Sequence, residues 1–256
     1  DDFITRPVLV LALLAVTVLF LAAICIALPL VLGRHDRLDR AARRRSRPFF
    51  TYFGGIGFGF LLLEIAQLQR LSSFLGHPTY GLAVVLFSVL VFSGIGSMLT
   101  ERIIRADRPQ SSLAPLVALI VVAAATGFIT PGLLHSMAGS TTPTRIALAV
   151  ALLAPMATFM GMPFAIGMRM AARTPDVPTA YLWGINGATS VCASVLGVVI
   201  ALFYGISTAF WFGCLAYVAA LASLAAMNRA AQPRLDLDRE ALGDPEADPA
   251  PQPVVV

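Results

Sequence analysis

Glu64, Gln67 and Arg70 are polar or ionisable residues that follow one another inside a long apolar stretch of this sequence. Glu64 lies about 15 residues into a run that starts near residue 49, hence about 22 Å from its beginning at 1.5 Å per helical residue. An ionisable group at such depth is costly in a membrane and normally faces protein or a water-filled cavity. Glu64 is therefore the principal candidate for a charge-carrying residue.

Residues near Glu64 in depth or on its helix face extend this candidate site. Gln67 is one turn further on and shares its face, whereas Arg70 is rotated by about 120° and is expected to extend outward. Asn186 is expected about 12 Å nearer the cytoplasm and is not paired with Glu64. Ser88 and Ser194 fall near its level in other apolar runs, and four residues gather at the outer mouth: Gln67, Arg70, His77 and Tyr80.

The composition requires a membrane. Of the 256 residues, 58% are hydrophobic and 12% are charged, whereas ordinary soluble domains carry about 25% charged residues. A membrane helix needs roughly 20 apolar residues. We therefore predict an all-α polytopic transmembrane bundle of seven spans, with boundaries near residues 7–33, 49–71, 79–99, 113–131, 146–168, 179–203 and 209–227.

The arginines orient this bundle. All 18 basic residues are Arg, which indicates a GC-rich bacterial genome and hence the bacterial inner membrane. With the N-terminus outside, fifteen lie on the inner side and three, Arg6, Arg70 and Arg145, lie outside, so the positive-inside rule predicts an outer N-terminus and a cytoplasmic C-terminus. The predicted parts are a first span with a short outer N-terminus (1–33), an Arg-rich cytoplasmic loop (34–48), a six-helix membrane module (49–227) and a disordered cytoplasmic tail (228–256).

Several patterns that could indicate other chemistry have a simpler interpretation. The glycines of 53–59 lack the strand and the third glycine of a nucleotide-binding loop, and Gly55 and Gly59 instead favour a close helix approach. The methionines of the fifth span, near Pro155 and Pro163, are expected to be flexible core packing, not a copper site. The three cysteines form no metal motif. No cofactor, metal, nucleic-acid partner or catalytic residue is expected.

The sixth span carries small residues at steps of three and four. This spacing places them on one helix face and predicts a tight helix crossing there. The residues are Gly187, Ser190, Ser194, Gly197 and Ala201.

The stretch from Tyr52 to about Met227 resembles the membrane module of bacterial spermidine-synthase-like membrane proteins. The resemblance covers most of the chain and rests on several short motifs in a fairly specific order. They are Glu64-Ile65, Leu75-Gly76-His77-Pro78-x-Tyr80, Ser93-Gly94-x-Gly96-Ser97, Met160-Gly161-x-Pro163, and Trp183-Gly184-x-Asn186-Gly187 with Ser190.

In that family, the resemblance implies fusion to an aminopropyltransferase-like or methyltransferase-like domain that binds S-adenosylmethionine or its decarboxylated form. The present sequence holds no soluble run of sufficient length for such a domain. We therefore do not expect this chain to be an enzyme by itself. Asp1-Asp2 resembles the acidic junction that closes the enzyme-like domain, which favours a fragment of a longer fusion.

Two functional hypotheses follow. In the first, the bundle binds or transports a small polar or cationic solute through Glu64, and the opposite senses of spans 2–4 and 5–7 permit the inverted repeats of transporters. In the second, it is a structural or accessory subunit that packs against another membrane protein or a separate enzyme-like domain. In that case the polar residues around Glu64 only fix the register of the helices.

Overall fold

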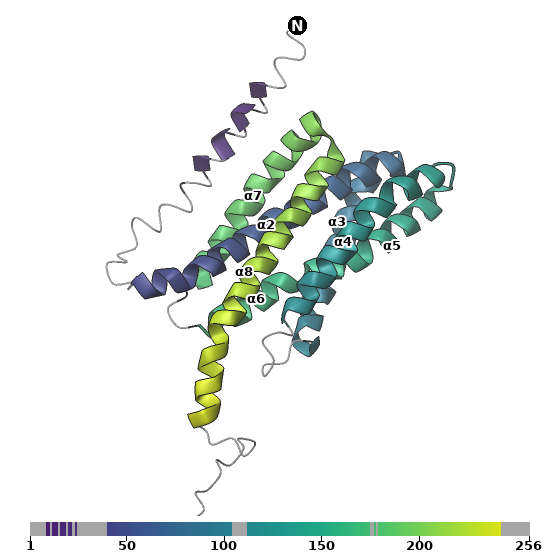
Figure 1. Ribbon diagram of the computed structural model, residues 1–256. Coiled ribbons are helices and arrows are strands. Elements are labelled where there is room, and N and C mark those ends of the chain that lie inside the picture. Colours follow the sequence, from purple (N-terminus) through teal and green to yellow (C-terminus); the bar gives the residue numbers. More distant parts are fainter. Residues whose placement is uncertain are drawn as a thin grey trace, which may run out of the picture.

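The computed structural model describes residues 40–103, 112–174, 177 and 179–241, together with scattered positions between 9 and 24. The regular elements of these residues are all helices (Figure 1). They are α2 (Arg40–Leu75), α3 (Pro78–Ile103), α4 (Leu113–Ser136), α5 (Thr142–Met160), α6 (Met162–Ala172), α7 (Thr179–Tyr204) and α8 (Ile206–Ala241).

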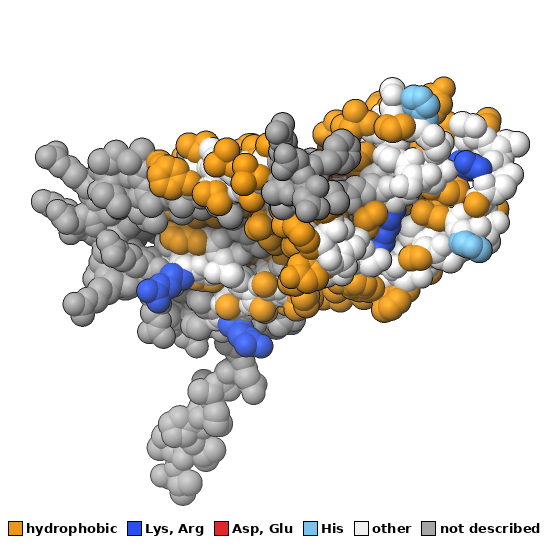
Figure 2. All heavy atoms as spheres, turned by 90° about the horizontal axis from the view of Figure 1, so that it is seen from above, with side chains coloured by type: hydrophobic (Ala, Val, Ile, Leu, Met, Phe, Trp, Pro, Cys, Tyr) orange, Lys and Arg blue, Asp and Glu red, His pale blue; other side chains and the backbone are white. Residues whose placement is uncertain are grey.

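Six segments among the described residues are long and apolar enough to cross a membrane, and α5 and α6 together form one of them. These segments confirm six of the seven predicted spans. The predicted first span, 7–33, lies outside the continuously described residues. Figure 2 shows hydrophobic side chains along the visible face, with Arg and His side chains toward its two ends. This distribution suits a surface that contacts lipid.

Helix α2 is the central element of the bundle. It passes between the pair α7 and α8 and the group α3, α4 and α5 (Figure 1). Its span, Ser46–Leu75, gives names to the two ends of the molecule. The end where this span begins is called the Ser46 end below, and the other is the Leu75 end.

Local sequence explains where the helices stop. Gly76, with φ of 74°, ends α2 in a conformation that glycine adopts without strain, and Pro78 starts α3, as the sequence predicted. Gly205, with φ of 92°, separates α7 from α8 in the same way.

Two boundaries differ from the prediction. Residues 40–48, expected in a loop, belong to α2, and residues 228–241, expected to be disordered, continue α8. Both segments are rich in Ala and Arg, which favour helix, so the helices extend past their apolar parts. The predicted single span 146–168 is divided at Gly161 into α5 and α6.

Glycines set the closest helix contacts. Gly55 and Gly59 of α2 face α8, so the prediction of a close approach there is confirmed. The predicted seam on α7 is used only in part. Ser190 and Gly197 contact α2, whereas Gly187 has nothing within 4 Å of its Cβ position.

Candidate functional site

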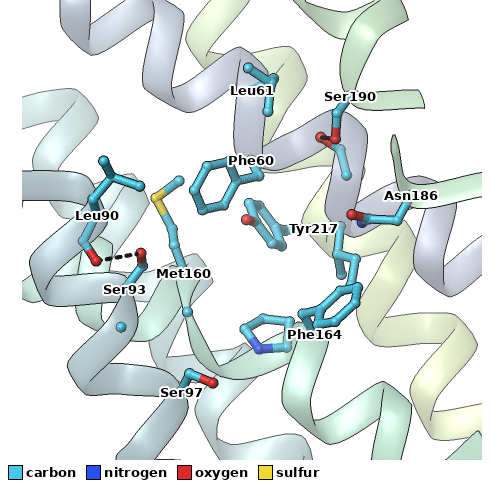
Figure 3. Close-up of a pocket in the computed structure, with 15 residues that line it drawn as sticks. Phe60, Leu61, Leu90, Ser93, Ser97, Met160, Phe164, Asn186, Ser190 and Tyr217 are labelled. Atoms are coloured by element: carbon cyan, nitrogen blue, oxygen red, sulfur yellow. Dashed lines mark hydrogen bonds between the residues drawn. The ribbon is translucent and has the colours of Figure 1, made fainter. Parts of the chain in front are cut away.

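A half-open cavity of about 440 Å³ lies between the helices of the bundle, and its lining includes the exposed residues Leu90 and Gly94 (Figure 3). Five parts of the chain surround it: α2, α3, the junction of α5 and α6, α7, and Tyr217 of α8. Its polar lining consists of hydroxyl and amide side chains, and its apolar lining includes two aromatic rings. The polar residues are Ser93, Ser97, Asn186, Ser190 and Tyr217, and the aromatic rings are those of Phe60 and Phe164.

Tyr217 is the most distinctive residue of this cavity. Its side chain is almost fully buried, yet its hydroxyl has no hydrogen-bond partner. A Cβ at Gly59 would lie 2.9 Å from the Tyr217 ring, so only glycine lets this ring pass α2. Figure 3 shows the ring among Phe60, Met160 and Phe164, in the middle of the lining residues. A buried tyrosine hydroxyl normally has a hydrogen-bond partner, so the hydrogen-bonding capacity of this hydroxyl is unused.

The opposite wall of the cavity is fixed by two long-range hydrogen bonds between α7 and α2. The Asn186 amide donates to the carbonyl oxygen of Phe53 at 3.1 Å. The Ser190 hydroxyl donates to the carbonyl oxygen of Gly57 at 3.1 Å. The amide oxygen of Asn186 makes neither bond and remains an acceptor. Asn186 therefore lies at the level of Phe53, well before Glu64 along α2, as the sequence predicted.

The third wall is the junction of α5 and α6. A Cβ on Gly161 would collide with the Ser93 backbone, and one on Gly96 would collide with the Thr158 backbone, so α3 and this junction meet main chain to main chain. The Tyr52 hydroxyl donates to the carbonyl oxygen of Pro163 at 2.6 Å. The helix interruption is thus held from both sides and has a fixed geometry.

The methionines near this junction are core residues, as predicted. Met156 and Met162 are buried, and Met160 is buried while also lining the cavity. Across the described residues, no group of three His, Cys, Asp or Glu side chains is placed to hold a metal ion.

Glu64 lies beside the cavity but does not line it. It is half-buried, without a hydrogen bond or ion pair among the described residues, and it interacts electrostatically with Tyr217. Gln67 is fully buried, and neither atom of its amide has a partner. Both residues are therefore polar groups inside the span whose bonding is incomplete.

Arg70 does not extend freely outward. Its guanidinium donates to the Ser207 hydroxyl at 3.0 Å and lies 4.8 Å from the centre of the Phe210 ring, so it packs against α8. A second guanidinium nitrogen, Nη1, is buried without a partner. The ring of Phe210 offers a cation–π contact that direct exposure would not provide.

The other four predicted residues are not gathered around the cavity. His77, in the turn between α2 and α3, and Tyr80, in the first turn of α3, are exposed, and their ring centres lie 5.5 Å apart with the rings tilted by 56°. Ser88 is buried on α3, and Ser194 donates to the carbonyl oxygen of Val191 within α7. Neither serine makes a hydrogen bond with Glu64 in the described part of the chain.

Sequence reasoning missed Tyr217. One signal was available: a tyrosine in the middle of a membrane span has a hydroxyl that needs a partner at that depth. Ser93 and Ser97 of α3 were noticed only as parts of a motif, and Asn186 was considered only for its depth relative to Glu64. Searches against protein-family models, curated proteins and solved structures found no match to this chain.

Proposed function

We propose that this chain is a multi-pass protein of a bacterial inner membrane, with its N-terminus outside and its C-terminus in the cytoplasm. It binds a small polar or cationic solute in the central cavity beside Glu64 and carries that solute across the membrane. One observation carries the proposal: the Tyr217 side chain lines a cavity at an interrupted helix, and its buried hydroxyl has no hydrogen-bond partner. In membranes, interrupted helices are tolerated where they line a cavity or are buried in protein, and transporters use them at their binding sites.

The cavity lining suits such a solute. A volume of about 440 Å³ is within the range of small-molecule sites. The Tyr217 hydroxyl can donate or accept, and the Asn186 amide oxygen can accept. The rings of Phe60 and Phe164 present aromatic surface that favours a cation, and an ionised Glu64 carboxylate would act in the same direction.

The resemblance to spermidine-synthase-like modules suggests an amine as the first probe. Its motifs lie far apart in the sequence, yet parts of three of them line the cavity: Ser93, Gly94 and Ser97, then Met160, Gly161 and Pro163, then Asn186 and Ser190. This convergence supports treating the motifs as one binding site. It does not depend on an enzyme-like domain.

The test is equilibrium binding of radiolabelled spermidine to the protein in lipid nanodiscs, with a neutral polyol of similar length as a second probe. Tyr217→Phe should weaken binding about tenfold, because one hydrogen bond to a charged group is lost. Tyr204→Phe is the matched control, because Tyr204 is exposed and does not line the cavity. Glu64→Gln should weaken spermidine binding more than polyol binding. Wild-type affinity for both probes in Tyr217→Phe and Glu64→Gln would refute the proposal.

A specific observation also favours an accessory role. On α7, the Cβ positions of Gly184 and Gly187 have nothing within 4 Å, and neighbouring Trp183 is 60% exposed. This face could admit the helix of a partner protein. Purification in mild detergent should then yield a stoichiometric complex that Gly187→Leu dissociates. A monodisperse monomer of the unmodified chain would exclude this role.

A further inference from the structure

Buried polar atoms without partners gather toward the Leu75 end of the bundle. Gln67 and Thr130 are fully buried, and neither the Gln67 amide nor the Thr130 hydroxyl has a hydrogen-bond partner. Nη1 of Arg70 is also buried and unpaired. These groups come from two helices, α2 and α4, and are buried between helices.

Phe210 of α8 connects these groups in space. The Arg70 guanidinium lies over its ring, and the same ring approaches Gly127 of α4 to 2.7 Å from the Cβ position. Thr130 is one helical turn beyond Gly127, and Gln67 is one turn before Arg70. Since α2 and α4 both run toward the Leu75 end, Thr130 lies nearer that end than the Phe210 ring and Gln67 lies nearer the cavity, so the unpaired groups follow one another in depth along α8.

On α2, a row of residues continues from Gln67 toward the cavity. Phe60, Glu64 and Gln67 are spaced four and three residues apart, which places them on one face of α2. Phe60 lines the cavity, and Glu64 interacts electrostatically with Tyr217, whose hydroxyl is also unpaired. The order from the cavity toward the Leu75 end is thus Tyr217, Glu64, Gln67 and Arg70.

Leaving these groups dry would be costly. An amide without a hydrogen-bond partner is strongly unfavourable in an apolar environment, and the hydrocarbon region of the bilayer supplies no water to bind it. Proteins resolve such cases with ordered water, which makes about three hydrogen bonds to otherwise unpaired groups. Together, four side chains supply the several polar partners that such water needs: Tyr217, Gln67, Arg70 and Thr130.

The Ser46 end is different. There three polar side chains bond across helices: buried Tyr52 to Pro163, part-buried Asn186 to Phe53, and buried Asn228 to Ser112. Arg169 of α6 also pairs with Glu101 of α3 at 3.2 Å. Water therefore has few free partners on this side of the cavity.

We propose that ordered water binds around Gln67 and Thr130 and connects the cavity to the Leu75 face, which makes this the side from which the site is reached. What travels along this path rests on the proposed function, but the path itself can be tested without a solute. Gln67 is the best position at which to test this path, because it is the fully buried polar residue between Glu64 and Arg70.

The test measures thiol labelling in sealed lipid vesicles, in a background whose three native cysteines are replaced by alanine. A small anionic, membrane-impermeant thiosulfonate is added to the side on which exposed His77→Cys reacts, and separately to the side on which exposed Arg173→Cys reacts; both residues lie outside the spans, at opposite ends. Gln67→Cys should react about tenfold faster from the His77 side than Leu63→Cys, because only a hydrated thiol ionises and reacts readily. Leu63 is equally buried, lies one turn away and packs on Gly213.

A second arm keeps the proposal testable if Gln67→Cys disturbs folding. Ser93→Cys places the thiol in the cavity, and Gln67→Leu in that variant should slow its labelling from the His77 side at least about fivefold, because an apolar side chain displaces water. Gln69→Leu is the matched control, since it removes the same amide from the same helix and Gln69 is not among the buried unpaired residues.

Equal, slow labelling of Gln67→Cys and Leu63→Cys would overturn the path, as would unchanged labelling of Ser93→Cys in the Gln67→Leu variant. Faster labelling of Ser93→Cys from the Arg173 side would overturn the proposal, because access would then come from the Ser46 end. If the thiols are labelled as predicted but neither spermidine nor the polyol binds, the water path is supported and the proposed function is refuted. The two proposals can therefore fail separately.

Discussion

The two halves of the bundle treat buried polar groups in opposite ways. Toward the Ser46 end, Tyr52, Asn186 and Ser190 each donate to a main-chain carbonyl of another helix. Toward the Leu75 end, Gln67 and Thr130 have no partner at all. Paired groups in apolar surroundings hold helices in one arrangement, whereas unpaired groups require something else to bind. The first half is therefore called the frame, and in our proposal the second half is the approach to the site.

Two buried tyrosines near the cavity show the same difference, because the hydroxyl of one is hydrogen-bonded and that of the other is not. Tyr52 and Tyr217 are among the largest fully buried side chains. Tyr52 uses its hydroxyl to hold the junction of α5 and α6, whereas Tyr217 lines the cavity beside that junction and its hydroxyl has no partner. Our proposal therefore gives the first tyrosine a structural role and the second a binding role.

The largest effect is expected where the frame meets the cavity. Gly161→Ala places a Cβ against the backbone of Ser93, which cannot move aside as a flexible side chain would. We expect a loss of about 3 kcal/mol or more in the free energy of unfolding, measured by chemical unfolding in mixed micelles.

Gly94→Ala is the control for this substitution. Gly94 also lines the cavity, but nothing lies within 4 Å of its Cβ position. Because alanine favours helix over glycine by about 1 kcal/mol, this variant should be as stable as the wild type or more so. Equal destabilisation by both changes would show that the junction is not a rigid part of the frame.

A smaller effect is expected from Tyr52→Phe and Tyr217→Phe in the protein without solute. Tyr52→Phe removes a hydrogen bond and leaves the Pro163 carbonyl without this donor, so unfolding should become easier by about 1–2 kcal/mol. Tyr217→Phe removes a hydroxyl that has no protein partner, so stability should change by less than about 0.5 kcal/mol. Similar losses in the two variants, measured by thermal unfolding in detergent, would break the contrast between frame and site.

The sequence predicted the frame better than the site for a physical reason. Span positions depend on local hydropathy, and the turn at Gly76 and Pro78 depends on the conformations of those two residues, so both can be read along the chain. The bond from Ser190 to Gly57 joins residues 133 apart, and no local pattern specifies it. Glu64 was found because its charge is unusual at that depth, although the structure puts it beside the cavity and not in its lining.

Tyr217 and Arg70 show two other limits of sequence reasoning. The position of the Tyr217 ring depends on the absence of a side chain at Gly59, which was recognised as a packing glycine without a known partner. Arg70 was expected to extend outward because of its helix position, but Ser207 and Phe210 of α8 hold it against the bundle. Both outcomes depend on how α8 packs on α2, which hydropathy does not specify.

The smallest effect is expected on α4, and it distinguishes a hydrated approach from a dry one. Thr126 and Thr130 are buried one turn apart, and the Thr126 hydroxyl donates to the carbonyl oxygen of Val122 at 2.8 Å while that of Thr130 has no partner. Thr126→Val should lower the free energy of unfolding by about 0.5 kcal/mol, the typical value of one hydrogen bond inside a membrane protein.

If no water binds Thr130, Thr130→Val would stabilise the protein by about 1 kcal/mol or more, because an unpaired hydroxyl would be removed from apolar surroundings. If water binds this hydroxyl, the gain from removing a polar group and the loss of its hydrogen bond to water offset each other. We therefore expect Thr130→Val to change the free energy of unfolding by less than about 0.3 kcal/mol, and a clear stabilisation would mean that the Leu75 half of the bundle is dry.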